Sequence, residues 1–238
     1  MNYCNTVILA ISISLVTLIT GCTYKEETRL NNKNILEKLA MKTTGNKKVV
    51  YERPVISFEL KNKIYDIVNL MSKDDLKSLN KNYIHSEFGF YNLLKIDGSN
   101  NFLEQNMIYN IIQEDMEEIS HMISRVDDNS LKLKIIEKDI QFNCSPNNDE
   151  FYGWSDDGLF LSSKTDTFLS SFIKEKILYE KSQYKKNDIQ KANFIEKTSY
   201  KVVLTPEVSF YITKIENNWY ITLIDRITTD CSTLKAEH

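Results

Sequence analysis

The sequence has few of the residues that mark catalytic or metal sites. It contains three histidines, four cysteines and six glycines among 238 residues. It has no Cys-x-x-Cys pair, no His-Glu-x-x-His, no Gly-x-Ser-x-Gly and no phosphate-binding glycine loop. We therefore expect neither a metal nor a cofactor. An enzyme is the less favoured class, although acid–base catalysis needs no linear motif.

A strong charge of one sign is also lacking. The chain has 30 Lys and Arg residues against 33 Asp and Glu residues, which gives a net charge of −3. The two signs are interspersed along the chain. Nucleic-acid-binding domains carry basic patches that neutralise phosphates. We therefore expect no nucleic acid among the partners of this protein.

No apolar run is long enough to cross a membrane, although the chain begins with a short one. The uncharged stretch Val7–Ile19 would form about 20 Å of helix, against roughly 30 Å of hydrocarbon core. This length is typical of a signal peptide. The segment Ile19-Thr20-Gly21-Cys22 resembles the lipobox of bacterial lipoproteins, which are cleaved before the cysteine and acylated on it.

The lipobox resemblance implies a signal peptide over residues 1–21 and lipid attachment at Cys22. The lipid bilayer would then be a partner, contacted through the acyl chains. Thr23 stands in place of the aspartate associated with inner-membrane retention, which implies an outer-membrane protein facing the periplasm or the cell surface. An uncleaved N-terminal anchor is the alternative, because the first five residues contain no Lys or Arg.

The remaining chain divides into a tether and a domain. Residues 22–53 are polar without a sustained apolar face, which predicts a flexible tether, and residues 54–238 are expected to form a single globular domain. Loss of the leader and acylation of Cys22 leave two cysteines. In an exported chain, Cys144 and Cys231 are predicted to form one structural disulfide.

The order of apolar periodicities predicts an α+β domain. Helical spacing is found over 56–71, 72–84, 102–124 and 166–186, with Ser72 and Asp166 as N-caps of the second and last. Strands are predicted over 85–96, 131–142, 198–205, 207–215 and 218–227, and the pair around the turn Asp157-Gly158 is expected to form a hairpin. We expect helices to cover one side of the sheet.

The ending "FYITKIENNWYITLID" (210–225) resembles the last hairpin of the nuclear transport factor two-like fold. This resemblance implies helices packed on a curved, mostly antiparallel sheet that ends in a C-terminal β-hairpin and surrounds a pocket. We expect positive φ at Asn217 or Asn218 in the hairpin loop. The fold hosts enzymes, ligand binders and adaptors, so it does not specify an activity.

The segment 144–158 concentrates acids, amides and aromatic residues. One interpretation is a surface for a carbohydrate, a peptide or Ca²⁺, with aromatic side chains beside carboxylates. The alternative, which we favour, is a hairpin turn packed beside the disulfide. The candidate residues are Asp149, Tyr152, Trp154 and Asp156.

Two weaker candidates concern charged or titratable pairs. His85 could act as a general base oriented by Glu87, although a lone histidine at a helix end is more often structural. Asp225 and Arg226 could form a charge pair in a pocket or an ordinary ion pair at a strand end. Neither arrangement predicts a reaction.

Taken together, these observations predict a membrane-anchored envelope lipoprotein. Its domain is expected to be non-enzymatic and to bind a protein or a small ligand. The first alternative is an immunity-type lipoprotein that neutralises an envelope-directed toxin. The second is an enzyme that uses an acid–base pocket.

Overall fold

The structure of the chain is a computed structural model. It describes residues 51–96, 99–108, 129, 132–145, 151–165, 168–179 and 184–231. The predictions on the leader, Cys22 and most of the tether concern residues outside these ranges. The same holds for Asp149, the N-cap Asp166 and the second half of the helix predicted over 102–124.

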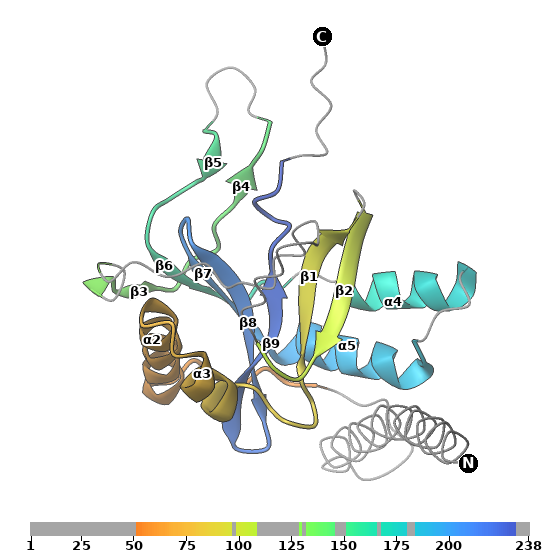
Figure 1. Ribbon diagram of the computed structural model, residues 1–238. Helices are drawn as coiled ribbons and strands as arrows, with labels where there is room; N and C mark the ends of the chain where they lie inside the picture. Colours follow the sequence, from red (N-terminus) through yellow and green to blue (C-terminus); the bar gives the residue numbers. More distant parts are fainter. Residues whose placement is uncertain are drawn as a thin grey trace, which may run out of the picture.

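The described residues form an α+β domain around a seven-stranded sheet, as predicted. The strand order is β2-β1-β9-β8-β7-β6-β3, with β9, β8 and β7 in the middle of the sheet (Figure 1). Among the described strands, only the pairs β1–β9 and β3–β6 are parallel. The strands are β1 (Phe90–Ile96), β2 (Ser99–Gln105), β3 (Ile135–Ile136), β6 (Leu159–Ser162), β7 (Tyr200–Leu204), β8 (Val208–Ile215) and β9 (Asn218–Asp225).

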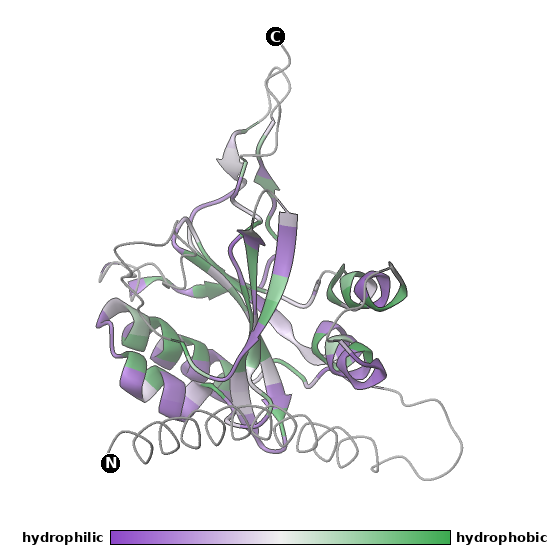
Figure 2. Ribbon diagram, turned by 45° about the vertical axis from the view of Figure 1, so that its right-hand side comes forward, coloured by the Kyte–Doolittle hydropathy of each residue, from purple (hydrophilic) through white to green (hydrophobic). Residues whose placement is uncertain are grey.

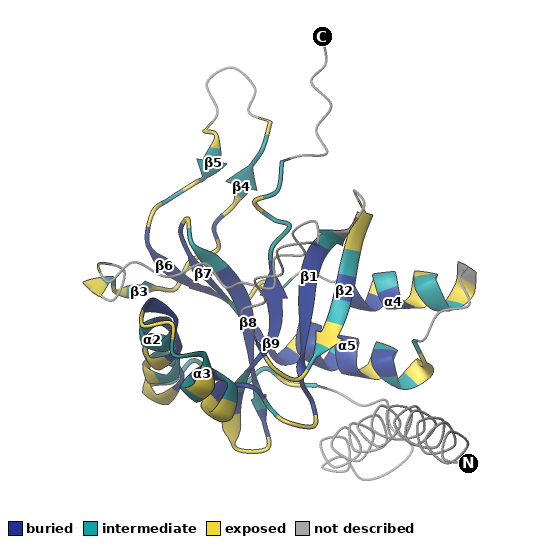
Figure 3. Ribbon diagram, viewed as in Figure 1, coloured by how far each residue is buried: buried dark blue, intermediate teal, exposed yellow. Residues whose placement is uncertain are grey.

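Helices cover both faces of this sheet, which corrects the expectation of one covered face. Helices α2 (Phe58–Ser72) and α3 (Leu76–Tyr83) lie on one face, and α4 (Phe168–Tyr179) and α5 (Lys186–Thr198) lie on the other (Figures 1 and 2). Alternate residues of β8 supply the two cores: Phe210 packs with α2, and Tyr211 packs with α5. Because both faces are buried, apolar side chains occupy consecutive positions of the central strands (Figure 3).

The C-terminal hairpin β8–β9 is confirmed, but its alternation is interrupted. Tyr211 pairs with Leu223 while Ile212 pairs with Ile221, so Thr222 is an extra residue in β9. This bulge places Leu223 in the core beneath α5, on the opposite face from Ile221. In the loop, positive φ occurs at Glu216 (57°) rather than at an asparagine.

Several predicted boundaries are wrong for local reasons. Asp75, and not Ser72, caps α3 by accepting the Ser78 N–H at 3.0 Å. Residues 102–105 belong to strand β2, because pairing with β1 overrides their helical periodicity. Helix α5 was not predicted as a separate helix. Two apolar residues within the predicted helices, Phe58 and Leu178, are 80% and 74% exposed.

The chain enters the domain at one end of the sheet. The Tyr200 hydroxyl at the start of β7 donates to the Pro54 carbonyl, and Arg53 donates to the Ser199 carbonyl at 2.7 Å. Strand β8 runs from the opposite end toward this one over eight residues, or about 25 Å. We call the end with Arg53, Pro54 and the Glu216 turn the entry end, and the other the far end.

Candidate functional site

The described residues on either side of 146–150 belong to a projection at the far end of the sheet. Strands β4 (Phe142–Asn143) and β5 (Gly153–Trp154) pair with each other and not with the main sheet. The hairpin expected across Asp157-Gly158 is therefore wrong, since β5 and β6 belong to different sheets. In Figure 1 the β4–β5 hairpin extends away from the body of the domain.

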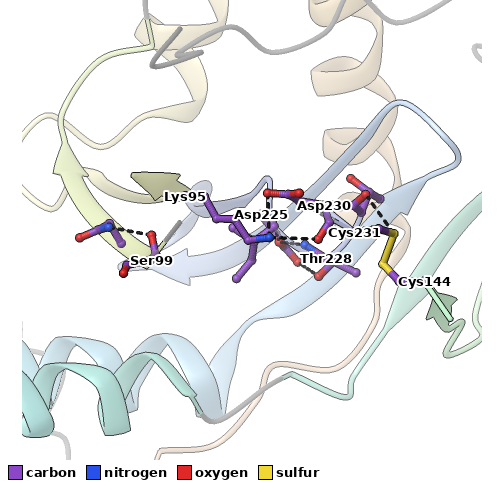
Figure 4. Close-up of polar contacts among 10 residues, drawn as sticks. Lys95, Ser99, Cys144, Asp225, Thr228, Asp230 and Cys231 are labelled. Atoms are coloured by element: carbon purple, nitrogen blue, oxygen red, sulfur yellow. Dashed lines mark hydrogen bonds and ion pairs between the residues drawn. A yellow bond between two sulfur atoms is a disulfide. The ribbon is translucent and has the colours of Figure 1, made fainter. Parts of the chain in front are cut away.

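A disulfide holds this projection to the C-terminal segment. Cys144 and Cys231 are bonded with a Cα–Cα distance of 5.4 Å, which confirms the predicted pair (Figure 4). Cys231 follows β9 at the far end, and Cys144 follows β4. The bond therefore closes a loop of 87 residues and fixes the base of a two-residue ladder that would be marginal alone.

The predicted surface residues do not all face solvent. Tyr152 is 68% exposed, and its neighbour Phe151, which is not among the predicted residues, is 43% exposed. Trp154 instead packs edge-on against Phe142, with ring centroids 5.1 Å apart. The Asp156 carboxylate forms an ion pair with Lys138 at 2.7 Å.

Trp154 and Asp156 make contacts within the domain and do not form an open surface. Trp154 contacts a small cluster of Ile140, Phe160 and Val203, and its buried Nε1 has no hydrogen-bond partner among the described residues. The hydrogen bond from Lys138 lowers the pKa of the Asp156 carboxyl. Trp154 and Asp156 thus support the base of the projection. Tyr152 and Phe151 form its accessible aromatic surface, named here the aromatic tip.

Asp225 and Arg226, at the end of β9, do not form an ion pair with each other. Each makes separate contacts at the far end. The Asp225 carboxylate accepts the N–H groups of Ile227 and Thr228 at 3.1 and 3.0 Å, which makes it the cap of a turn (Figure 4). Arg226 projects elsewhere and donates from Nε to Asn92 at 3.1 Å. Burial lowers the pKa of the Arg226 guanidinium to about 10. The two charges serve different local structures.

Lys95 adds a second connection in this region. Its ammonium lies 3.0 Å from the Asp230 carboxylate and donates to the Asp230 carbonyl at 3.2 Å. Because Asp230 precedes Cys231, this contact joins β1 to the residue beside the disulfide (Figure 4). The far end is therefore held by both covalent and ionic links.

His85 lies at the other end of the sheet and acts as a cap. Its Nδ1 accepts the backbone N–H groups of Glu87 at 3.2 Å and Phe88 at 3.1 Å. Burial lowers the pKa of the His85 imidazole, and the charges of Glu87 and Glu216 oppose this shift. A neutral ring that accepts at Nδ1 carries its proton on Nε2. Nδ1 is thus occupied by backbone donors, and no contact between the Glu87 carboxylate and the ring orients a base.

A pocket of about 660 Å³ opens beside His85 at the entry end. This volume lies within the usual range of 300–1,000 Å³ for small-molecule sites. The pocket lies between the end of α3, the turn after it, the residues that follow β2, and the start of β9. Its wall includes Lys77, Lys81, His85, Ser86, Met107 and Tyr220.

Two other features are absent from the part of the chain that the structure describes. Within those ranges, no group of three or more His, Cys, Asp or Glu side chains could hold a metal ion. Among the same residues, no helix has the length and apolar character needed to cross a membrane.

The comparisons with known proteins give no family. No protein-family model matches the chain, and no match was found among curated proteins or solved structures.

Proposed function

We propose that this chain is a lipid-anchored envelope lipoprotein whose domain is a non-enzymatic binding module. In this proposal Cys22 carries the lipid, the residues between Cys22 and the entry end form the tether, and the aromatic tip of the β4–β5 hairpin contacts a protein partner. The observation that carries the proposal is the placement of two exposed aromatic side chains on a disulfide-held projection. Aromatic residues are enriched where protein interfaces are energetically strongest.

The position of the aromatic tip supports this role. The chain enters the domain through Arg53 and Pro54 at the entry end, and the tip lies at the far end. A tether that leads from the entry end to a membrane would leave the far end directed away from that membrane. The tip would then be accessible to partners in the periplasm or outside the cell.

The disulfide supports the proposed compartment. Disulfides persist in exported proteins and are rare in the reducing cytosol. The pair Cys144–Cys231 agrees with a leader that directs the chain out of the cytosol. The lipobox-like sequence before Cys22 supplies the route, and acylation with two or more chains would anchor the domain stably.

The charge of the hairpin segment limits the kind of partner. Residues 144–158 contain four acidic side chains and no Lys or Arg. Asp156 is paired with Lys138, and the sequence beside Phe151 and Tyr152 also contains Asp149, Glu150 and Asp157. A partner with a basic rim around an apolar or aromatic pocket would be complementary.

Lipid attachment is tested by metabolic labelling. Cells that express the wild-type protein should incorporate labelled palmitate into it, and the Cys22→Ala variant should incorporate none. Equal labelling of both would refute the anchor at Cys22. Protease treatment of intact and permeabilised cells would then distinguish a surface-facing domain from a periplasmic one.

Binding at the tip is tested by site-specific photocrosslinking in living cells. A photoreactive phenylalanine at position 152 should yield a defined adduct, whereas the same residue at Leu178 should not. Leu178 is a matched control because it is similarly exposed but lies on α4. The identified partner should bind the purified protein, and Tyr152→Ser should weaken that binding at least tenfold. Absence of a position-specific adduct would refute the tip as an interface.

An immunity-type role is a narrower form of the same proposal. A toxin delivered to the envelope is a protein partner, and a basic toxin would suit the acidic hairpin segment. Deletion of the gene should then leave cells sensitive to toxin from their siblings. The likeness of residues 210–225 to the nuclear transport factor two-like fold also remains part of the proposal. The helix-first order and the terminal hairpin support it.

A further inference from the structure

The pocket at the entry end presents hydrogen-bond donors that the protein itself does not use. The Lys77 and Lys81 ammonium groups, the Ser86 hydroxyl and the His85 Nε2–H have no hydrogen-bond or ion-pair partner within the described ranges. No carboxylate side chain is among the residues that line the pocket. A set of donors without direct hydrogen-bond or ion-pair partners favours a negatively charged occupant.

Helix geometry reinforces this preference. Lys77 and Lys81 are four residues apart on α3, so they lie on the same side of this eight-residue helix. Like charges in this arrangement repel and weaken a helix. Both side chains are exposed, and nothing in the fold requires two lysines there. An anion between them would offset the repulsion.

His85 contributes a fixed donor to the same wall. Backbone bonds to Nδ1 hold the ring in one orientation, and the Tyr220 ring packs edge-on against it with centroids 5.0 Å apart. The Nε2–H is consequently oriented by the protein without any ligand. Preorganised donors of this kind reduce the entropy lost on binding.

The remaining wall is mainly apolar, apart from Asn80 and Asn106. Met107 is 51% exposed, although methionine side chains are usually buried, and Tyr220 and Ile84 lie on the same wall. Methionine adapts its shape to varied apolar groups. The pocket thus combines a positively charged side with an apolar side.

We propose that this pocket binds an organic anion with an apolar body. A carboxylate or phosphate head would lie between Lys77 and Lys81, and an alkyl or aromatic body would contact Met107 and Tyr220. The pocket opens at the same end of the domain through which the chain enters. Both a free metabolite and an anionic membrane lipid have the required chemistry. The proposal does not depend on the aromatic tip.

The test is calorimetric titration of the full chain held in nanodiscs of neutral lipid, with empty nanodiscs as the blank. Hexyl phosphate and hexanoate should bind saturably. Hexanol, which has the same body without the charge, and inorganic phosphate, which has the head without the body, should each bind at least tenfold more weakly. Equal binding of hexanol or of inorganic phosphate would overturn the proposed chemistry.

Substitutions of the lining residues test whether hexyl phosphate binds in this pocket. The double variant Lys77→Gln/Lys81→Gln should weaken hexyl phosphate binding about tenfold, and Met107→Gln about threefold. Lys186→Gln is the control, because Lys186 is an exposed lysine on α5 across the sheet. All substituted side chains are exposed, so folding should be preserved. Unchanged affinity in the double variant would place the site elsewhere.

A competition experiment distinguishes a membrane lipid from a free molecule as the ligand. Nanodiscs that contain an anionic lipid should compete with hexyl phosphate if the occupant is a membrane lipid, and should leave its affinity unchanged if the occupant is a free molecule. Tyr152→Ser should bind hexyl phosphate normally in either case. A failure of anion binding at the pocket can therefore be told apart from a failure of partner binding at the aromatic tip.

Discussion

The Lys191 ammonium lies 2.6 Å from the Glu104 carboxylate, although the Lys191 side chain is 2% exposed. Lys191 also donates to the Phe88 carbonyl, and its ammonium lies over the Phe88 and Tyr91 rings at 4.5 and 4.9 Å from their centroids. A buried ammonium requires such compensation, because leaving it without a carboxylate costs several kcal/mol in a dry interior. This contact joins α5 to strand β2 beneath the sheet edge.

Removal of the Glu104 charge should therefore destabilise the domain more than loss of a surface pair. We expect Glu104→Gln to cost about 1–2 kcal/mol, reduced from the fully buried case because Glu104 is partly exposed. In the double variant with Lys191→Met, part of this cost should be recovered. Urea unfolding measures the double-mutant cycle. The exposed pair Lys61–Glu137 is the control, with a coupling below about 0.5 kcal/mol.

The disulfide should be a major source of stability. It closes a loop of 87 residues, for which the chain-entropy estimate is about 4 kcal/mol. Reduction, or the double substitution Cys144→Ser/Cys231→Ser, should lower the free energy of unfolding by up to that amount. Proteolysis should then cleave within 141–156 first. If reduced and oxidised proteins unfold at the same urea concentration, the bond contributes no net stability.

His85 should make stability depend on pH in one direction. Burial lowers its pKa below the ordinary value, so the folded state binds the proton less readily than the unfolded chain. The contribution is fully present above the unfolded pKa of about 6.5 and decreases as the pH falls through that value toward the folded pKa. Protonation of Nδ1 would also remove the acceptor for the Glu87 and Phe88 N–H groups.

His85→Asn provides the comparison, because asparagine can accept a backbone hydrogen bond but does not titrate in this range. Between pH 7 and pH 5, the wild-type protein should lose stability relative to this variant. His85→Ala, which removes the cap, should cost about 1 kcal/mol at pH 7. Equal pH slopes for wild type and His85→Asn would contradict the assignment. NMR titration of the imidazole gives the folded pKa directly.

Glu196 should be replaceable by glutamine but not by alanine. Its Oε1 accepts the Ser170 N–H at 2.8 Å in the first turn of α4, and burial raises the pKa of its carboxyl. A raised folded pKa means that stability decreases as the pH rises from the ordinary value through the folded one. Glu196→Gln keeps an acceptor and removes this dependence, so its stability at pH 7 should equal or exceed that of the wild type.

Glu196→Ala leaves the buried Ser170 N–H without its acceptor and should cost about 1–2 kcal/mol. Thermal unfolding of the two variants at pH 7 and pH 4.5 separates the effects. A destabilised glutamine variant would show that the charge, and not the hydrogen bond, supports α4.

Much of the fold could be predicted because periodicity reports burial. The helical period of α2 and the strand period of β8 are both visible in the sequence, and adjacent residues of β8 such as Phe210 and Tyr211 lie in opposite cores. The wrong predictions concern residues whose secondary structure or facing is decided by strand pairing. Residues 102–105 have a helical pattern but complete an antiparallel ladder with β1, and Thr222 breaks an alternation that the sequence shows as continuous.

The candidate sites were likewise predictable where local sequence decides the structure, and not where strand pairing decides it. The sequence indicated that segment 144–158 was unusual and that its cysteine pairs with Cys231, but not that Trp154 packs inward while Phe151 is exposed. The exposure of these side chains depends on which strands pair. Because β4 pairs with β5 and not with the main sheet, the segment extends away from that sheet. The pocket beside His85 could not be predicted, because it joins residues from 77 to 220.

The sequence by itself determined the α+β class, the terminal hairpin and the pairing of the two cysteines, since periodicity and cysteine count depend on local pattern and composition. Tertiary structure alone decided that helices cover both faces of the sheet and that chain entry and aromatic tip lie at opposite ends. It also decided that Lys77 and Lys81 share a pocket with His85. Those relationships arise from contacts between distant segments, which a linear pattern does not record.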